Sequence, residues 1–185
     1  MSAPSRISLK NIKHAAFASH ETHCFEATVC LDGDRACKVE NDGKGGSDHY
    51  YPYKGQSNES FNIMIVKLRE ACADQLKVED PETYEQFCPR SESNEVDYSR
   101  LGDTCIEIVV CNTLNTSLIK KDIKRLMRAK VQLIEVSSGK IYEIKSKPLK
   151  ETLERVKKQY EPEYLVLNTL SEEEQFYHWT KTTEA

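Results

Sequence analysis

Residues able to do chemistry are most concentrated between positions 20 and 53. The segment NDGKGG, residues 41–46, places three glycines within four positions, and the loop HETHC, residues 20–24, precedes it along the chain. Glycines at positive φ let successive backbone N–H groups point into one concave site, where they bind anions. The segment therefore predicts a site for a phosphate or another acidic group, with Lys44 adding positive charge.

A β-hairpin is expected to bring the two loops side by side. Residues 24–31, CFEATVCL, alternate apolar and polar side chains, and Asp32-Gly33 is a strong turn signal before a return strand. The first strand begins where HETHC ends, and the second ends where NDGKGG begins. The residue opposite Cys24 is therefore expected to belong to the glycine-rich segment.

The length of the hairpin loop decides which residues pair. A two-residue loop, favoured by Asp-Gly, pairs Val29 with Ala36, whereas a three-residue loop pairs Val29 with Cys37. The second alternative also places Ala27 opposite the apolar Val39. Because a shift of one residue turns every side chain to the other face, burial favours the three-residue loop.

Three interpretations of the two loops stay open. In the first, the glycines only let the chain leave the sheet sharply, and the histidines lie in solvent. In the second, the loop binds a nucleotide or another phosphorylated ligand, with or without hydrolysis, although NDGKGG lacks the P-loop spacing. In the third, a metal binds, although HxxHC without a second ligand pair is weak beside zinc spacings. The ligands for that metal would be His20, His23, Cys24 and Asp42.

The aromatic run that follows the glycines favours a binding surface. Residues 49–53 hold three tyrosines in four positions of a predicted loop, where they are hard to bury together. Tyrosine is enriched at recognition surfaces. The contact surface predicted from the sequence consists of His20, His23, Asn41, Asp42, Gly43, Lys44, Gly45, Gly46, His49, Tyr50, Tyr51 and Tyr53.

Catalysis has weaker support in the sequence. Cys24 beside a histidine resembles a nucleophile with its base, but seven cysteines and five histidines make chance proximity common. Asp32 and Asp34 belong to a turn, where aspartate has a local role. We therefore expect a non-enzymatic binding protein that needs no cofactor.

A basic helix is the second candidate surface. Residues 117–130, SLIKKDIKRLMRAK, predict an amphipathic helix capped by Asn115 or Thr116. Its charges suit a solvated face or contact with nucleic acid, and Glu172–Glu174 are able to neutralise them within the fold. The residues that nucleic acid would contact are Lys120, Lys121, Lys124, Arg125 and Arg128.

Composition limits the class of protein. The 185 residues are 38% hydrophobic and 30% charged, which is typical of a globular protein with a charged surface. A net charge of −4 argues against nonspecific binding to nucleic acid. No apolar run approaches the roughly 20 residues that a bilayer requires, and the first residues lack the core of a signal peptide. An odd number of cysteines without a secretion signal favours reduced thiols, so a cytoplasmic protein without membrane contact is expected.

The predicted fold class is α+β with mainly antiparallel sheet, an N-terminal hairpin, flanking amphipathic helices, a second hairpin and C-terminal helices. The predicted organisation is an N-terminal region over 1–88, a polar linker over 89–103 and an α+β region over 104–185, or one compact domain overall. Other elements predicted in the N-terminal region are a strand over 6–17 with a bulge or break near Asn11, a short helix from Pro81, and before it a helix from Ser57 or Asn58 with Phe61, Ile65, Leu68, Cys72 and Leu76 inward. A buried strand over 104–112 and a hairpin of 131–136 and 141–145 are predicted next. The last predicted elements are a helix from Pro148 with Leu149, Leu153, Val156 and Tyr160 inward, a strand over 164–168, and a helix after the capping box Ser171–Glu174 that is anchored by Phe176, Tyr177 and Trp179.

Three blocks of the chain resemble a family of small proteins carried by bacteriophages and plasmids. Residues 17–53 are similar to its FAS, ET, CF and AT pattern before an NDG-x-GG loop, 121–145 to its helix and hairpin, and 164–177 to its closing LN-L segment. That family's loop often has histidine between the glycines and cysteine after them, where this chain has Lys44 and Ser47. The resemblance implies no named activity. It implies a mobile-element protein that binds and blocks a host protein, such as a defence factor.

Overall fold

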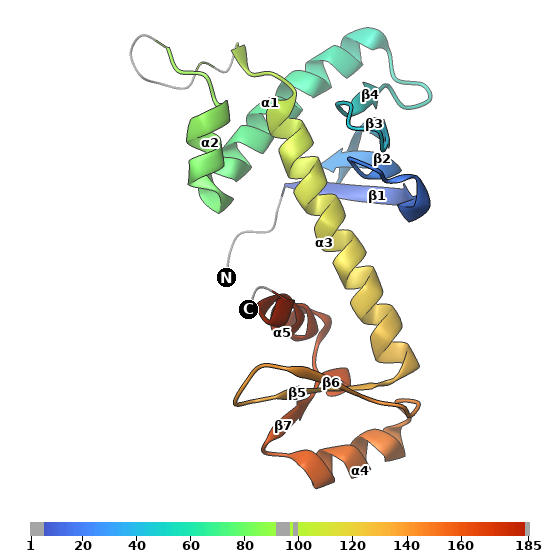
Figure 1. Ribbon diagram of the computed structural model, residues 1–185. Coiled ribbons are helices and arrows are strands. Elements are labelled where there is room, and N and C mark those ends of the chain that lie inside the picture. The colour runs from blue at the N-terminus through green and yellow to red at the C-terminus, as the bar shows by residue number, and fades with distance from the viewer. Residues whose placement is uncertain (1–5, 92–96, 98–99, 184–185) are drawn as a thin grey trace. The chain divides into compact units, whose positions relative to one another are not determined.

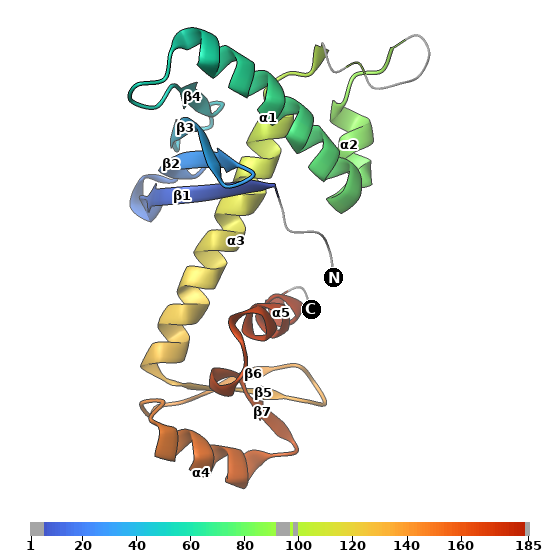
Figure 2. The ribbon, with the colours of Figure 1, turned by 180° about the vertical axis from the view of Figure 1, so that it is seen from behind.

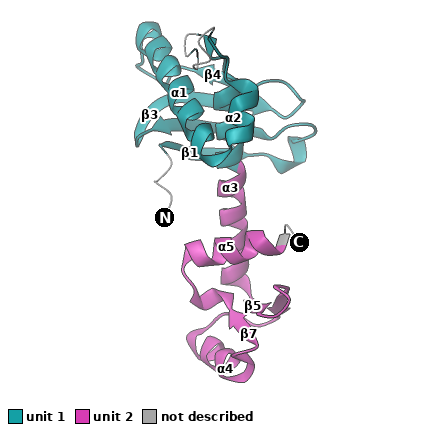
Figure 3. Cartoon of the chain, turned by 90° about the vertical axis from the view of Figure 1, so that its left-hand side faces the viewer, with its two compact units in different colours: residues 1–114 teal, residues 115–185 magenta. Residues whose placement is uncertain are grey.

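The computed structural model describes residues 6–91, 97 and 100–183 (Figure 1). The chain forms two compact units, residues 1–114 and 115–185 (Figure 3). The division falls inside helix α3, Thr104–Ala129. The linker expected over 89–103 lies within the first unit, and its residues 92–96 and 98–99 are outside the described part of the chain. The α+β class expected from the sequence is confirmed.

The first unit contains a four-stranded antiparallel sheet. Its strands β1 (Ile7–His14), β2 (Cys24–Leu31), β3 (Asp34–Asp42) and β4 (His49–Tyr51) lie side by side in chain order. A short 3-10 helix, Ala16–Ala18, connects the first two strands. Strand β4 corrects the prediction that residues 49–53 form a loop throughout.

The β2–β3 hairpin combines features of both predicted alternatives. The pairs expected from a three-residue loop, Val29 with Cys37 and Ala27 with Val39, are present. The loop nevertheless has only two residues, Asp32-Gly33, both at positive φ. A shift of register next to Val29 accommodates the extra residue in β3, so the predicted loop length is wrong and the predicted burial is right.

Strand β1 has the irregularity that its sequence predicted. Its pairing with β2 shifts between Lys10 and Lys13, and Asn11 has a φ of 54°. Asparagine tolerates this left-handed conformation better than most residues. The bulge restores the alternation of the strand and places Lys13 opposite Glu26.

Helices cover one face of this sheet. Helices α1 (Asn58–Glu79) and α2 (Pro81–Phe87) follow the sheet, and α1 and the first turns of α3 lie on its same face (Figures 1 and 2). The side chain of Ser57 caps α1 by accepting a hydrogen bond from the Ser60 backbone N–H. The residues of α1 predicted to face inward are buried except for Phe61, which is half-buried.

The predicted strand over 104–112 is wrong, because these residues are the first turns of α3. Their β-branched residues favour a strand locally, but their burial repeats every three to four residues, as on one side of a helix. The helix also passes through Asn115 and Thr116, which therefore cap nothing. The buried residues of the first turns of α3 are Cys105, Ile106, Val109, Val110 and Leu114.

No described helix is both long enough and apolar enough to cross a membrane.

The second unit contains a three-stranded antiparallel sheet. Its order is β6 (Ile141–Ile144), β5 (Val131–Glu135), β7 (Tyr164–Val166), and the predicted β5–β6 hairpin is confirmed. A 3-10 helix, Leu167–Thr169, follows β7. The central strand β5 is apolar on both faces because helices lie on both faces (Figure 1).

Two helices complete this unit, α4 (Lys150–Tyr160) and α5 (Glu172–Thr183). Leu149, predicted to face inward, is 64% exposed because it is the cap residue before α4 rather than part of it. The capping box of α5 is confirmed. The Ser171 hydroxyl oxygen accepts from the Glu174 N–H at 3.3 Å, and the Glu174 carboxylate accepts from the Ser171 N–H at 2.9 Å. Phe176 and Trp179 pack against the core, whereas Tyr177 is 52% exposed and does not.

Asn168 links three parts of the second unit. Its Nδ2 donates to the carbonyl oxygens of Met127 at 2.7 Å and Lys130 at 2.9 Å, where α3 ends. Its Oδ1 accepts from the Gln132 backbone N–H at 2.7 Å. One amide side chain therefore satisfies backbone groups that the helix end and the strand leave without partners.

We expect Asn168→Ala to destabilise the second unit by about 2 kcal/mol, because it leaves buried backbone groups unsatisfied. Trp179 is the only tryptophan of the chain and lies in this unit, so its fluorescence during urea unfolding measures the effect. Gln159→Ala, at an exposed position of α4, is the control and should change little. Equal unfolding midpoints for the two variants would contradict this role of Asn168.

Candidate functional site

The HETHC and NDGKGG loops meet at one backbone oxygen. The N–H groups of His20 and Glu21 donate to the carbonyl oxygen of Gly43 at 3.0 and 3.1 Å, and that of Thr22 is 3.5 Å away. Cys24 pairs with Asp42 across the hairpin. The predicted proximity of the two loops is therefore confirmed.

The buried side chain of Asn41 organises the glycine-rich loop. Its Oδ1 accepts from the Thr22 hydroxyl at 2.8 Å and from the Gly43 N–H at 2.9 Å. Its Nδ2 donates to the Gly46 carbonyl and to the Asp48 carboxylate, both at 2.9 Å. All four interactions are internal, so Asn41 holds the loop together and has little capacity left for a ligand.

Close packing at position 43, and positive φ at positions 43 and 45, explain two of the glycines. A Cβ atom on Gly43 would lie 2.3 Å from the Ala18 carbonyl oxygen and 2.9 Å from the Cys24 Cβ. A Cβ atom on Gly45 would lie 2.1 Å from the Glu21 carboxylate. Both glycines also have positive φ. These contacts therefore support the first interpretation, in which the glycines let the chain turn sharply as it leaves the sheet.

The anion nest predicted from the glycines is not open in this structure. The Gly43, Lys44 and Gly45 N–H groups donate to Asn41, Asp42 and Thr22 side chains, respectively. The Lys44 ammonium lies 3.6 Å from the Asp42 carboxylate. A phosphate would have to displace these contacts beside the Glu21 and Asp42 carboxylates.

The histidines form a pair that the sequence did not predict. His23 Nδ1 lies 3.3 Å from His14 Nε2, and the rings meet edge to face. His20 is exposed and contributes its backbone N–H to the loop contact. No group of three His, Cys, Asp or Glu side chains among the described residues has the geometry to hold a metal ion. The predicted set of His20, His23, Cys24 and Asp42 does not form such a group.

The cysteines are free thiols, and five of the seven are buried. Burial raises the pKa of Cys37 and of Cys88 to about 12 in each case. A thiol with so high a pKa is a poor nucleophile at neutral pH. Cys24 is half-buried and Cys111 is exposed. The buried thiols therefore serve as small apolar groups, as their number without a secretion signal predicted.

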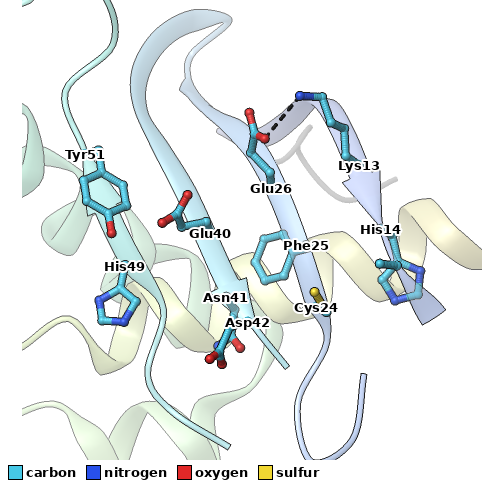
Figure 4. A pocket seen from close by; sticks show the side chains of 11 residues that line it. Lys13, His14, Cys24, Phe25, Glu26, Glu40, Asn41, Asp42, His49 and Tyr51 are labelled. Atoms are coloured by element: carbon cyan, nitrogen blue, oxygen red, sulfur yellow. Dashed lines mark hydrogen bonds and ion pairs between the residues drawn. The ribbon is translucent and has the colours of Figure 1, made fainter. Parts of the chain in front are cut away.

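A groove of about 630 Å³ lies on the face of the first sheet opposite the helices of that unit, and we call it the sheet groove (Figure 4). All four strands contribute to it, and the helices lie behind the sheet in this view. His14, Cys24 and Asn41 line its end beside the loops. Its charged and aromatic lining also includes Lys13, Glu26, Glu40, Asp42, His49 and Tyr51.

One row of side chains crosses the groove from strand to strand. The register pairs Lys13 with Glu26, Glu26 with Glu40, and Glu40 with His49. Lys13 and Lys38 lie 3.2 and 3.9 Å from the Glu26 carboxylate. Two carboxylates directly opposite each other on neighbouring strands destabilise a sheet. Both lysine contacts are made with Glu26, although Lys38 belongs to β3, the strand of Glu40. The Glu40 carboxylate instead hydrogen-bonds with Tyr51.

The three tyrosines do not share one surface, contrary to the prediction. Tyr51 is 42% exposed and lines the groove, and a hydrogen bond with the Glu40 carboxylate raises its pKa. Tyr50 pairs with Val39 and points to the other face, where burial raises its pKa and its hydroxyl lies 3.4 Å from the Asp48 carboxylate. Tyr53 is half-buried in the turn before α1. Alternation along β4 separates these side chains.

The sequence prediction missed three charged residues of the groove, Lys13, Glu26 and Glu40. The pairing of Glu26 with Glu40 could have been predicted from the sequence, because the pairing of Ala27 with Val39 also pairs these two glutamates. The place of Lys13 could not have been predicted, since it depends on the bulge at Asn11. Of the predicted surface, Asn41, Asp42, His49 and Tyr51 line the groove.

The basic helix is partly neutralised within the second unit. Lys124 lies 2.6 Å from Glu172, as the acidic start of the last helix predicted, and Arg125 lies 3.2 Å from Asp122. The Lys120 ammonium stacks over the Phe176 ring at 5.1 Å. Lys121 and Arg128 are exposed. These contacts compete with phosphate for the cations that nucleic-acid binding would need.

Two carboxylates share a smaller cavity of about 160 Å³ beneath the glycine-rich loop. Glu107 of α3 accepts hydrogen bonds from the Ser47 side chain and the Asp48 N–H. Burial, followed by the charge of Asp48, raises the pKa of Glu107. Burial also raises the pKa of Asp48. The loop is thus joined to α3 by a carboxylate held under partly desolvated conditions.

Comparison with protein-family models, curated proteins and solved structures found no match to this chain. The resemblance to phage and plasmid proteins therefore stays a prediction.

We expect Gly43→Ala to destabilise the first unit by about 3 kcal/mol, because the new Cβ atom would clash with the neighbouring loop. Gly33→Ala is the matched control, since Gly33 also has positive φ but has nothing within 4 Å of a built Cβ. The control should lose only about 1 kcal/mol from backbone strain. Urea unfolding followed by circular dichroism measures both, and equal losses would contradict the close packing of the two loops.

We expect Glu107→Gln to change how stability depends on pH. The folded-state pKa of Glu107 lies above its ordinary 4.5, so the folded protein binds more protons than the unfolded chain between these two values. This carboxyl group therefore lowers stability as pH rises through that window. The free energy of unfolding of Glu107→Gln, relative to that of the wild type, should therefore increase as pH rises above 4.5. Urea midpoints across a pH series measure this, with the exposed Glu154→Gln as control, and parallel curves would contradict it.

Proposed function

We propose that this protein is a non-enzymatic binding protein that captures a partner protein and thereby inhibits or diverts it. The sheet groove is the contact surface, and the partner contributes a segment with arginine or lysine side chains. The resemblance to phage and plasmid proteins makes a host protein, such as a defence factor, the partner class to examine first.

The pairing of Glu26 with Glu40 is the observation that carries this proposal. Like charges directly opposite on neighbouring strands cost stability, and sequences that break such a local rule do so most often at functional sites. Both lysines near this pair contact Glu26. An arriving guanidinium or ammonium group between Glu40 and Asp42 would relieve the repulsion and gain charge-assisted hydrogen bonds.

The aromatic side of the groove fits the same kind of partner. Tyr51 is exposed and stands beside the Glu40 carboxylate. Its ring centroid is 6.5 Å from that of His49, so the two rings form one side of the groove (Figure 4). Aromatic faces attract arginine and lysine, and tyrosine is frequent where binding energy concentrates. Carboxylates beside aromatic rings favour a cationic protein segment over a phosphate backbone.

We expect Glu40→Gln to weaken binding of a synthetic peptide of alternating arginine and threonine at least tenfold, because it removes a charge-assisted contact. The same variant should be about 0.5 kcal/mol more stable than the wild type, since it removes the repulsion with Glu26. Fluorescence anisotropy measures binding, and urea unfolding measures stability. Because binding is expected to weaken while stability increases, the loss of binding cannot be attributed to unfolding.

Tyr51→Ala should also lose binding, whereas Glu154→Gln in α4 is the charge-matched control and should bind as the wild type does. A parallel capture from host lysate, quantified for wild type and both groove variants, identifies proteins that depend on Glu40 and Tyr51. Unchanged peptide binding by Glu40→Gln, or equal binding of a glutamate–threonine peptide, would overturn the proposal.

A further inference from the structure

The second unit has a cavity of its own, of about 610 Å³, which lies between the β5–β6 hairpin and the last turns of α5. We call it the hairpin cavity. Helix α5 lies beside this hairpin in both ribbon views (Figures 1 and 2). The Thr182 hydroxyl donates to the Gly139 carbonyl at 2.8 Å, which joins the helix end to the hairpin turn. The volume of the hairpin cavity is within the range of small-molecule sites. None of the candidate site residues predicted from the sequence lines this cavity.

The walls of the hairpin cavity are apolar and continue the core of the unit. Ile134 is buried in the cluster with Ile123, Met127 and Leu167, and Leu165 packs against that cluster. Val136 also lines the cavity but is 66% exposed. An apolar body bound here would cover Val136 and extend an existing core, which is favourable in proportion to the area removed from water.

The rim of the cavity carries an excess of basic groups. Lys140 comes from the hairpin, and His178 and Lys181 come from α5. Among the described residues that line the cavity, Glu135 carries the single carboxylate, which accepts hydrogen bonds from the Ser138 and Tyr142 hydroxyls. The Lys140 and Lys181 ammonium groups outnumber this carboxylate, so the described rim is net positive, and the Lys181 ammonium also lies 4.6 Å from the centre of the Tyr177 ring.

From this combination we infer that the second unit binds a small amphipathic anion, an apolar carboxylate whose chain fills the cavity and whose head group meets Lys140 and Lys181. Apolar walls select the body of the ligand, and a few placed charges fix its orientation. The inference concerns a different unit from the sheet groove and is independent of the proposed function.

Trp179 provides a built-in reporter. It packs against the same apolar cluster as Leu165 and is the only tryptophan of the chain. Decanoate added to the full-length protein should change its fluorescence saturably, whereas decylamine, with the same chain and the opposite charge, should not. Hexanoate should bind more weakly than decanoate, because it covers less of the apolar wall.

The double variant Lys140→Gln/Lys181→Gln should bind decanoate roughly tenfold more weakly, since it loses the charged hydrogen bonds to the head group. Lys158→Gln, at an exposed position of α4, is the charge-matched control, and Glu40→Gln in the other unit should also bind as the wild type does. Val136→Asp places a carboxylate at the cavity and should abolish binding, with circular dichroism confirming that the variant is folded.

Several results would overturn the inference. One is the absence of any saturable change with decanoate. Others are equal responses to decanoate and decylamine, an unchanged affinity in the double lysine variant, or a response that appears only with loss of structure. Binding of an acidic, leucine-rich peptide in place of decanoate would assign the cavity to a protein partner and would also overturn it.

Discussion

The hydrogen bonds of the Asn41 side chain are the constraint on which the first unit depends. A buried amide has two donors and two acceptor positions, and here all of them are used within two loops that are distant in the sequence. Because each partner is itself a loop residue, the amide replaces the pairing that a strand would provide. The glycine-rich segment then folds tightly against Ala18 and Cys24, which only residues without a Cβ atom allow. What resembles a ligand cradle in the sequence is a self-satisfied turn.

Because this tight turn engages the loop amides, we place the proposed function on the sheet groove and not on the loop. Glu26, Glu40 and Tyr51 line that groove, on the face of the sheet opposite the helices of the first unit. An open antiparallel face is normally polar and lets opposite charges pair across strands. Here one carboxylate faces another. The cost of that arrangement, rather than the number of charges, is the reason why we propose the groove as the contact surface for a basic protein segment.

In the second unit, the side-chain amide of Asn168 likewise satisfies backbone groups, and this unit has a cavity of a different character. Its amide joins the end of α3 to β5 and allows a short sheet to carry helices on both faces. An apolar cavity with a basic rim lies between the β5–β6 hairpin and the last turns of α5. A small sheet of this kind gains stability when its unfilled apolar surface is covered. The ligands that we propose for the two units therefore differ in charge and in kind.

The sequence by itself determined the elements whose signals are local. The alternation in β2, the bulge at Asn11 and the capping box at Ser171 depend on neighbours a few residues apart, and all three were predictable. Residues 104–112 were not, because β-branched residues favour a strand until the long helix through Asn115 and its packing override them. Tertiary structure decided the rest of the candidate site. The contact of Asn41 with Thr22 and the place of Lys13 beside Glu26 join segments distant in the sequence, and such pairing is a long-range property that no single segment encodes. The alternation that separates Tyr50 from Tyr51 is local, but it applies only because residues 49–51 pair with β3 as a strand.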